Sequence, residues 1–286
     1  MPGFKTIGEV VDAELNGKVR NYIWRKTPSQ TTVSGLWFDT SMSPGMPPPQ
    51  YYIGGITTAT QLKQSTDGGL YHGPNVSPSG KDLRRMTTMA NAVTALLMNT
   101  ILCDYLLFYP FIDMGTTDQQ VMTNVNTLPR YTDGKGVQVM AVLTNAGLGG
   151  QQFFFTYTNS DGVPGRISQT VTMNTSTVVG NVIGSNTAIQ NASNPFIGLQ
   201  LGDSGVRSIE GITMLGVDTG LFALVLVKPL AQHCFREVTV PYEKDYLVPT
   251  TDLVRIFDDA FLGMLSLPLG TLAATVLRGD LKVIWT

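Results

Sequence analysis

The sequence predicts an all-β, mainly antiparallel fold, either a β-sandwich or a jelly-roll-like barrel, with long loops and one or two short helices. Short runs of β-branched and aromatic residues recur along the chain, separated by turns rich in Gly, Asn and Asp. Strands follow one another without regular intervening helices, which argues against a parallel α/β sheet. We expect one β-rich domain over residues 1–286, with residues 1–50 as a candidate extended N-terminal arm.

The N-terminal third predicts two strands and a stiff connector. Val19 to Arg25 and Thr31 to Phe38 are rich in β-branched and aromatic residues. The run Pro47-Pro48-Pro49 favours polyproline II, a spacer that stays out of a sheet interior and often lies across a neighbouring surface. Gly54 to Gly80 contains enough glycine and proline to predict a long surface loop.

The rest of the chain predicts further strands and two helical segments. The strongest signal is a three-stranded meander formed by Val137 to Leu143, Phe153 to Thr158 and Arg166 to Met173. Other strands are expected at residues 101–109, 177–183, 209–215, 221–227 and 281–285. One helix is suggested by the spacing of Met86, Met89, Val93, Leu96 and Leu97. A second is predicted with Thr250 or Thr251 as its cap and Leu253, Ile256, Phe257, Ala260 and Phe261 along one face.

Charge is scarce for a chain of 286 residues. Hydrophobic residues make up 43% and charged residues 14%, so we expect other subunits to cover part of the surface. The net charge of −2 gives no global positive field that would attract nucleic acid or anionic lipid. The cationic cluster of Lys81, Arg84 and Arg85 is interrupted by Asp82, which indicates a solvated face or an inter-subunit salt-bridge patch.

Cysteine usage and the first residues indicate folding in a reducing cytoplasm. Cys103 and Cys234 lie in apolar contexts without CxxC spacing, so we expect buried thiols. The start of the chain lacks an apolar signal core, and no apolar run reaches the length of a membrane span. The sequons at Asn75, Asn174 and Asn191 are therefore expected to remain unmodified.

One segment invites a catalytic hypothesis. Gly202-Asp203-Ser204-Gly205 resembles the nucleophile segment of chymotrypsin-like proteases, and His72, Asp118 and Ser204 follow that family's order. Val206 departs from the family pattern, which has a second glycine there. We expect a polar β-turn in which Asp203 or Ser204 bonds backbone amides and Gly205 supplies an unusual φ.

Other local patterns do not form a chemical site. His72 and His233 are isolated, and Asp258-Asp259 lacks the regular ligand spacing of a calcium loop. Arg278-Gly279-Asp280 is expected to turn the chain into its last strand. We therefore predict no catalytic residues, no metal ligands and no cofactor, and we expect the aromatic residues to serve the core and an interface.

Several sequence segments resemble those of a known family. They are Gly35 to Asp39 with Ser43-Pro44-Gly45 and Tyr51-Tyr52, Ser65 to His72, Leu128 to Gly134, Gly202 to Glu210, and Leu224 to Pro229. Together they resemble tailed-bacteriophage virion structural proteins of the head region. This resemblance implies a capsid-associated structural role, such as a decoration or cement protein, and carries over no catalytic residues.

We therefore expect a non-enzymatic protein that binds and stabilises a phage capsid, made in the host cytoplasm and located in the phage head. Its expected partners are the major capsid protein or other virion proteins and further copies of itself, with a trimer as the candidate oligomer, and neither nucleic acid nor membrane. The interface residues predicted are Pro47, Pro48, Pro49, Tyr51, Tyr52, Arg84 and Arg85. The alternatives are a tail or connector component, a receptor- or glycan-binding module, and a chymotrypsin-like serine protease.

Overall fold

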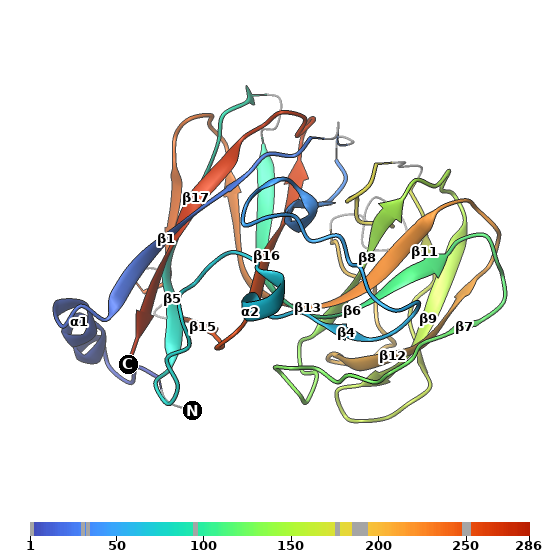
Figure 1. Ribbon diagram of the computed structural model, residues 1–286, viewed down its shortest axis with the longest axis horizontal. Coiled ribbons are helices and arrows are strands. Elements are labelled where there is room, and N and C mark those ends of the chain that lie inside the picture. The colour runs from blue at the N-terminus through green and yellow to red at the C-terminus, as the bar shows by residue number, and fades with distance from the viewer. Residues whose placement is uncertain are drawn as a thin grey trace.

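Antiparallel strands in three sheets make up most of the architecture (Figure 1). The computed structural model describes residues 3–29, 32, 35–93, 97–174, 178–184, 194–247 and 253–286. Two short helices, α1 (Ile7–Leu15) and α2 (Gln64–Asp67), and a 3₁₀ turn, η1 (Thr40–Met42), accompany the sheets. The predicted all-β antiparallel class is confirmed. Within the described residues, no helix has the length and hydropathy of a membrane span.

Each sheet combines strands from distant parts of the sequence. The N-terminal sheet has the order β14-β5-β17-β1-β3, with β15 beside β5. Its strands are β1 (Val19–Lys26), β3 (Gly45–Met46), β5 (Lys81–Ala90), β14 (Tyr242–Asp245), β15 (Val254–Ile256) and β17 (Leu277–Trp285). The central sheet has the order β2-β16-β6-β13-β8, with β4 beside β6. Its strands are β2 (Phe38–Asp39), β4 (Thr60–Gln61), β6 (Met98–Asp113), β8 (Gln138–Asn145), β13 (Leu221–Phe235) and β16 (Phe261–Pro268).

The distal sheet is the smallest of the three. It has the order β10-β9-β12-β7, with β11 also pairing with β9. Its strands are β7 (Gln120–Val121), β9 (Gln152–Asn159), β10 (Arg166–Ile167), β11 (Val171–Thr172) and β12 (Val206–Met214).

The central sheet belongs to two sandwiches at once. Its strands β6 and β13 are 16 and 15 residues long and pair with each other along nearly their whole length. Met98 and Leu102, near the start of β6, share a core with Trp24 and Leu281 of the N-terminal sheet. Tyr109, further along the same strand, belongs to the core that contains the distal sheet. The two lobes of the molecule are thus joined by continuous strands (Figure 1).

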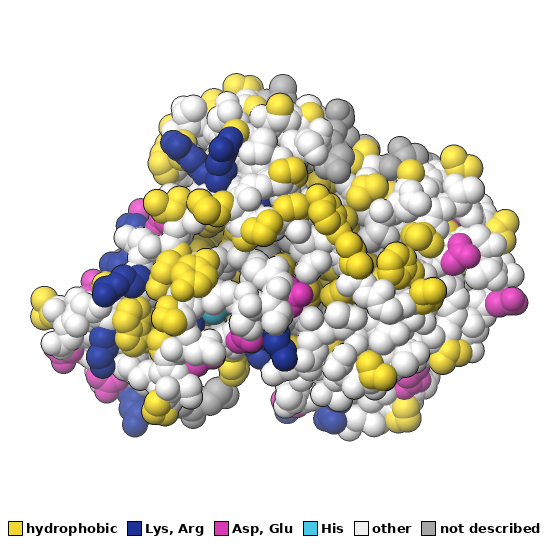
Figure 2. Space-filling model, in the orientation of Figure 1, with side chains coloured by type: hydrophobic (Ala, Val, Ile, Leu, Met, Phe, Trp, Pro, Cys, Tyr) yellow, Lys and Arg dark blue, Asp and Glu magenta, His cyan; other side chains and the backbone are white. Residues whose placement is uncertain are grey.

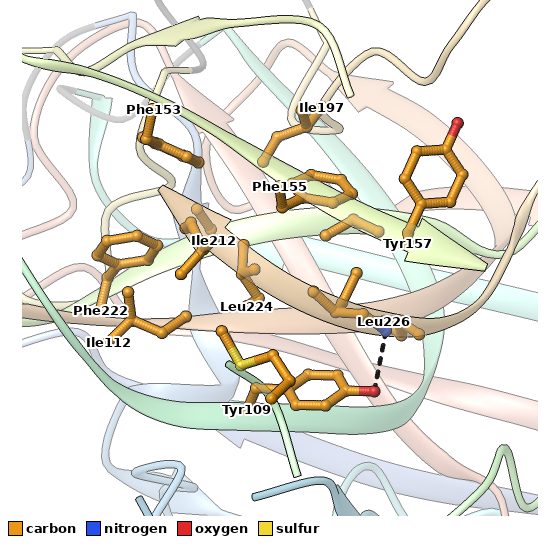
Figure 3. Close-up of a cluster of buried hydrophobic side chains, with 14 of the residues drawn as sticks. Tyr109, Ile112, Phe153, Phe155, Tyr157, Ile197, Ile212, Phe222, Leu224 and Leu226 are labelled. Atoms are coloured by element: carbon orange, nitrogen blue, oxygen red, sulfur yellow. Dashed lines mark hydrogen bonds between the residues drawn. The ribbon is translucent and has the colours of Figure 1, made fainter. Parts of the chain in front are cut away.

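Aromatic side chains fill the distal core (Figure 3). Phe153, Phe155 and Tyr157 alternate inward from β9, as the two-residue period of a strand requires. The ring of Phe153 meets that of Phe222 from β13 at a centroid distance of 5.2 Å. The Tyr109 hydroxyl donates to Asn124 Oδ1 at 2.7 Å and accepts from the Ile209 amide at 3.1 Å, so its polar end is satisfied within the core.

A buried ion pair lies where the two sandwiches meet. Arg130 donates to both carboxylate oxygens of Asp104 on β6, at 2.8 and 2.7 Å, and both side chains are almost fully buried. The same guanidinium donates to the carbonyls of Leu62, Tyr105 and Asp259 at 3.0 to 3.2 Å. Burial raises the pKa of Asp104, and the Arg130 guanidinium opposes that rise.

The two predicted helices are wrong. Residues 81–90 form β5, which pairs with β17 over its whole length, and residues 94–96 of the first predicted helix lie outside the described residues. The second is replaced by β15, a turn and β16, where Asp259 has a φ of 59°; its predicted caps, Thr250 and Thr251, are not among the described residues. In both places, pairing with distant strands outweighs the local pattern.

The predicted meander is also incorrect in its pairing. β8 lies in the central sheet beside β13, whereas β9, β10 and β11 belong to the distal sheet, so the chain crosses from one sheet to the other after β8. Of residues 31–38, only Phe38 lies in a strand among those described. The Arg278-Gly279-Asp280 triplet does not form a turn, because it lies within β17.

The N-terminal segment contains both integrated and exposed parts. In residues 1–50, for which an extended arm is predicted, β1 pairs with β17 along its whole length. This strand is therefore an integral part of a sheet. Residues 47–50, including the prolines, lie in no helix or strand.

Replacing Arg130 with Met should destabilise the fold by about 3–5 kcal/mol, because the Asp104 carboxylate would stay buried without its partner. Chemical denaturation of the variant measures the loss. Lys135→Met, at an exposed position, is the matched control and should change little. The double variant Asp104→Leu/Arg130→Met should recover much of the loss, and equal stability of Arg130→Met and wild type would contradict the role of the pair.

Candidate interaction surface

A band of exposed apolar side chains follows the connector between β3 and β4. Figure 2 shows hydrophobic side chains crossing the face on which this connector lies. We define the connector band as Met46, Pro48, Tyr51, Ile53 and Ile56, which are all exposed. Ile53 and Ile56 are each 74% exposed, far more than is usual for isoleucine in a folded chain.

The start of the connector and the residues just before β3 are held by a buried lysine. Lys26, at the end of β1, donates from Nζ to the carbonyls of Ser41, Ser43 and Pro48 at 3.1 to 3.3 Å. Burial lowers the pKa of Lys26 from 10.5 to about 8, while the Asp39 carboxylate partly opposes the shift. The ammonium group thus fixes three points of the segment from Ser41 to Pro48, which contains only the end of η1 and the two-residue strand β3.

A buried carboxylate holds the inner side of the same segment. Asp39 accepts from the Ser41 amide at 2.9 Å, from the Tyr105 hydroxyl at 2.9 Å and from the Tyr52 hydroxyl. Tyr52 packs edge-on against Phe108 of β6 at 5.4 Å. Tyr52 is therefore turned into the core, and burial raises the pKa of its hydroxyl well above the usual value.

The far end of the connector is joined to the sandwich that contains the distal sheet. The Thr57 amide donates to the Pro110 carbonyl at 3.0 Å, at the end of β6. The Thr123 amide donates to the Thr57 carbonyl, and the Ala59 amide donates to the Thr123 carbonyl, both at 2.9 Å. The band therefore spans the junction of the two lobes and is fixed at both ends.

The predicted interface residues fall into three groups. Tyr51 and Pro48 are exposed on the connector band, and Pro47 and Pro49 are half-buried beside them. Tyr52 is buried and its side chain does not reach the surface. Arg84 and Arg85 lie elsewhere, on the N-terminal sheet.

Both of these arginines form ion pairs within the chain. Arg84 pairs with Asp245 and, at 3.4 Å, with Glu14, whereas Arg85 pairs with Glu243 at 3.3 Å and Asp280 at 3.4 Å. The solvated face that the sequence suggested for this cluster is not found, because Lys81 and Asp82 are buried and both arginines are only partly exposed. The alternative, a salt-bridge patch between subunits, stays a prediction.

The protease-like residues are dispersed. His72 is buried, and its Nε2 lies 2.8 Å from the Ala260 carbonyl. The Ser204 hydroxyl contacts that of Ser160 at 2.8 Å. The amide of Asp118 donates to Thr116 Oγ1 at 3.1 Å. Among the described residues, no hydrogen bond or ion pair joins His72, Asp118 and Ser204 to one another.

The Gly202–Gly205 turn differs in detail from the prediction. The Asp203 carboxylate binds side chains and not backbone amides, accepting from Tyr157, Asn159 and Arg166. The Arg166 guanidinium lowers the pKa of Asp203 to about 2. Gly202 has the positive φ, 93°, while a Cβ at Gly205 would lie 2.0 Å from the Gly134 carbonyl oxygen. Gly205 is therefore needed for close backbone approach.

The aspartate pair has a structural role in a turn. Asp258 accepts from the amides of Val76 and Ser77 and pairs with Lys81 at 3.4 Å. Asp259 accepts from the amide and hydroxyl of Ser65. Among the described residues, no group of three His, Cys, Asp or Glu side chains is placed to hold a metal.

The remaining thiol and histidine predictions can be placed directly. Cys103 is buried and Cys234 is half-buried, and both are free. His233 lies 2.9 Å from the Thr100 hydroxyl and stacks on Tyr242 at 5.4 Å. Burial lowers the pKa of both His72 and His233 to about 4. Of the three sequons, Asn191 lies outside the described residues.

Comparison of the chain with protein-family models, with curated proteins and with solved structures gave no match.

The buried Lys26 predicts a specific pH dependence of stability. Its pKa is about 8 in the folded chain and near 10.5 when exposed, so between these values the unfolded chain binds more protons. Stability should therefore rise with pH from about 8 to 10.5, by up to about 3 kcal/mol from this residue. Urea denaturation at a series of pH values measures it for wild type and Lys26→Met.

The informative quantity is the difference between the two proteins, since other groups titrate in both. Lys63→Met, at a half-exposed lysine, serves as the control and should keep the wild-type slope. An identical slope in wild type and Lys26→Met would contradict the assigned burial of the ammonium group.

Proposed function

We propose that this chain is a non-enzymatic virion structural protein of a tailed bacteriophage, which binds the capsid and stabilises it through the connector band. The observation that carries the proposal is the row of exposed apolar side chains on a segment fixed at both ends. Exposed apolar patches on a folded surface mark interaction sites, because contact with a partner removes them from water.

The fixation of the connector supports a role in binding. A flexible loop would lose conformational entropy on docking, whereas the bonds of Lys26 to the Pro48 carbonyl, of the Tyr52 hydroxyl to Asp39 and of Thr57 with Thr123 already restrict this segment. The side chains of Tyr51, Ile53 and Ile56 can thus be buried at small entropic cost.

The resemblance of the sequence to head-region proteins supports the nature of the partner. Composition is consistent with it, since 14% charged residues leave a surface that relies on uncharged polar and apolar groups. A capsid offers a repeated surface on which a modest contact is used many times.

The double variant Ile53→Asp/Ile56→Asp should lose binding to particles that lack this protein by about tenfold or more, because two charges would have to be desolvated at the contact. Occupancy is measured by incubating purified protein with such particles, pelleting them and quantifying the bound chain. Resistance of the particles to heat should fall in parallel.

Leu201→Asp is the matched control, because Leu201 is 98% exposed and lies in the turn before β12, away from the connector. It should bind as wild type does. Unchanged binding of the Ile53/Ile56 variant would remove the connector band from the contact, and absence of binding by the wild-type chain would contradict the proposed function itself.

A further inference from the structure

Helix α1 carries more apolar surface on its outer side than on its inner side. Val10 and Ala13 are buried against Ile284 of β17. Ile7, Val11 and Leu15 recur every four residues, so they form one stripe, and they are 60%, 49% and 80% exposed. An ordinary surface helix places its large apolar residues inward, so this outer stripe indicates a second contact.

The helix is well formed without any partner. The Thr6 side chain accepts from the Glu9 amide at 3.2 Å, and Glu9 Oε2 accepts from the Lys5 amide. Such reciprocal capping stabilises the first turn. The stripe is therefore presented on a preformed element.

The outer face of the N-terminal sheet lies beside this helix. Trp24 of β1 and Leu277 and Leu281 of β17 point into the core, so the alternating positions Ile23, Arg25 and Arg278 face outward. Ile23 is 76% exposed. Figure 1 shows α1 at one end of this sheet, with β1 leading away from it.

Most charged side chains on this face form ion pairs within the chain. Two basic and two acidic side chains do not. Arg25 and Arg278 are directly opposite each other on β1 and β17, an unfavourable pairing of like charges. Glu9 and Asp12 are exposed on α1. Among the described residues, none of these four side chains takes part in an ion pair.

We propose that a second copy of this chain covers the face, in a two-fold dimer in which α1 of each copy lies on β1 and β17 of the other. Glu9 and Asp12 then meet Arg25 and Arg278 of the second copy, and the Ile7-Val11-Leu15 stripe packs on Ile23. Both contacts form twice, because a two-fold pairing is reciprocal.

The geometry allows this arrangement. Arg25 lies six residues from Val19, which pairs with Ile284 beneath α1, so the basic pair is about 20 Å along the strand from the helix. Antiparallel stacking of two sheets places the helix end of one over the basic end of the other. Doubling of the contact brings it towards the roughly 1,200–2,000 Å² of stable interfaces, which a single nine-residue helix could not reach.

Sedimentation equilibrium of the full chain over a range of concentrations tests the proposal. Wild type should dimerise, and both Arg25→Glu/Arg278→Glu and Glu9→Lys/Asp12→Lys should raise the dissociation constant by about tenfold or more. An equimolar mixture of the two variants should dimerise as wild type does, since every contact in the mixed pair again joins opposite charges.

Val11→Asp provides a second test, in which a carboxylate placed in the apolar stripe would have to be desolvated at the contact while Glu9, Asp12, Arg25 and Arg278 stay unchanged. Leu201→Glu is the control that should dimerise normally. Far-UV circular dichroism checks that each variant is folded. If Glu9→Lys/Asp12→Lys does not fold, Val11→Asp and Arg25→Glu/Arg278→Glu test the proposal without it. A monomeric wild type, a trimer, or a dimer unaffected by these substitutions would overturn the proposal, as would failure of the mixture to restore pairing.

Discussion

The guanidinium of Arg130 is satisfied by groups from three separate parts of the chain, in a place from which water is excluded. Two charges in such a place are costly unless every donor and acceptor has a partner. Here the carboxylate of Asp104 and the carbonyls of Leu62, Tyr105 and Asp259 supply the acceptors. This requirement fixes the end of β4 and the turn before β16 relative to the shared strand β6. The two sandwiches consequently have one defined junction.

The same principle shapes the connector that crosses this junction. Lys26 and Asp39 are charged side chains placed in the interior. Each is surrounded by carbonyls, amides or hydroxyls, which come from the segment that it holds and, for Asp39, also from Tyr105 of β6. Only 14% of the residues are charged, yet several of these side chains are buried and hold backbone segments in place. The outside of the connector is left to Tyr51, Ile53 and Ile56, whose exposure is costly unless a partner covers them.

Local patterns predicted the fold class and most strands, because alternation and β-branched residues report burial on one face of a strand. They failed where partners far away in sequence decide the outcome. Met86 and Met89 have helical spacing, yet β5 pairs with β17, nearly 200 residues later, and places them on opposite faces. For the site, the absence of the proline segment from any strand could be predicted, but which tyrosine of Tyr51-Tyr52 turns inward could not, since it depends on Asp39. Helix α1, which was not predicted, did have a recognisable N-terminal capping pattern, Thr6 with Glu9 three residues later.

The connector band and the outer face of the N-terminal sheet meet at a single point. Met46 on β3 pairs with Arg25 on β1, so a second copy lying on Arg25 reaches this end of the band. The other end of the band is joined to Pro110 and Thr123 of the sandwich that contains the distal sheet, and Ile53 and Ile56 lie towards that end. A two-fold dimer would therefore leave two copies of this part of the band exposed. Because two linked contacts bind a repeated surface far more tightly than one, pairing through α1 would strengthen attachment without any new residue in the band.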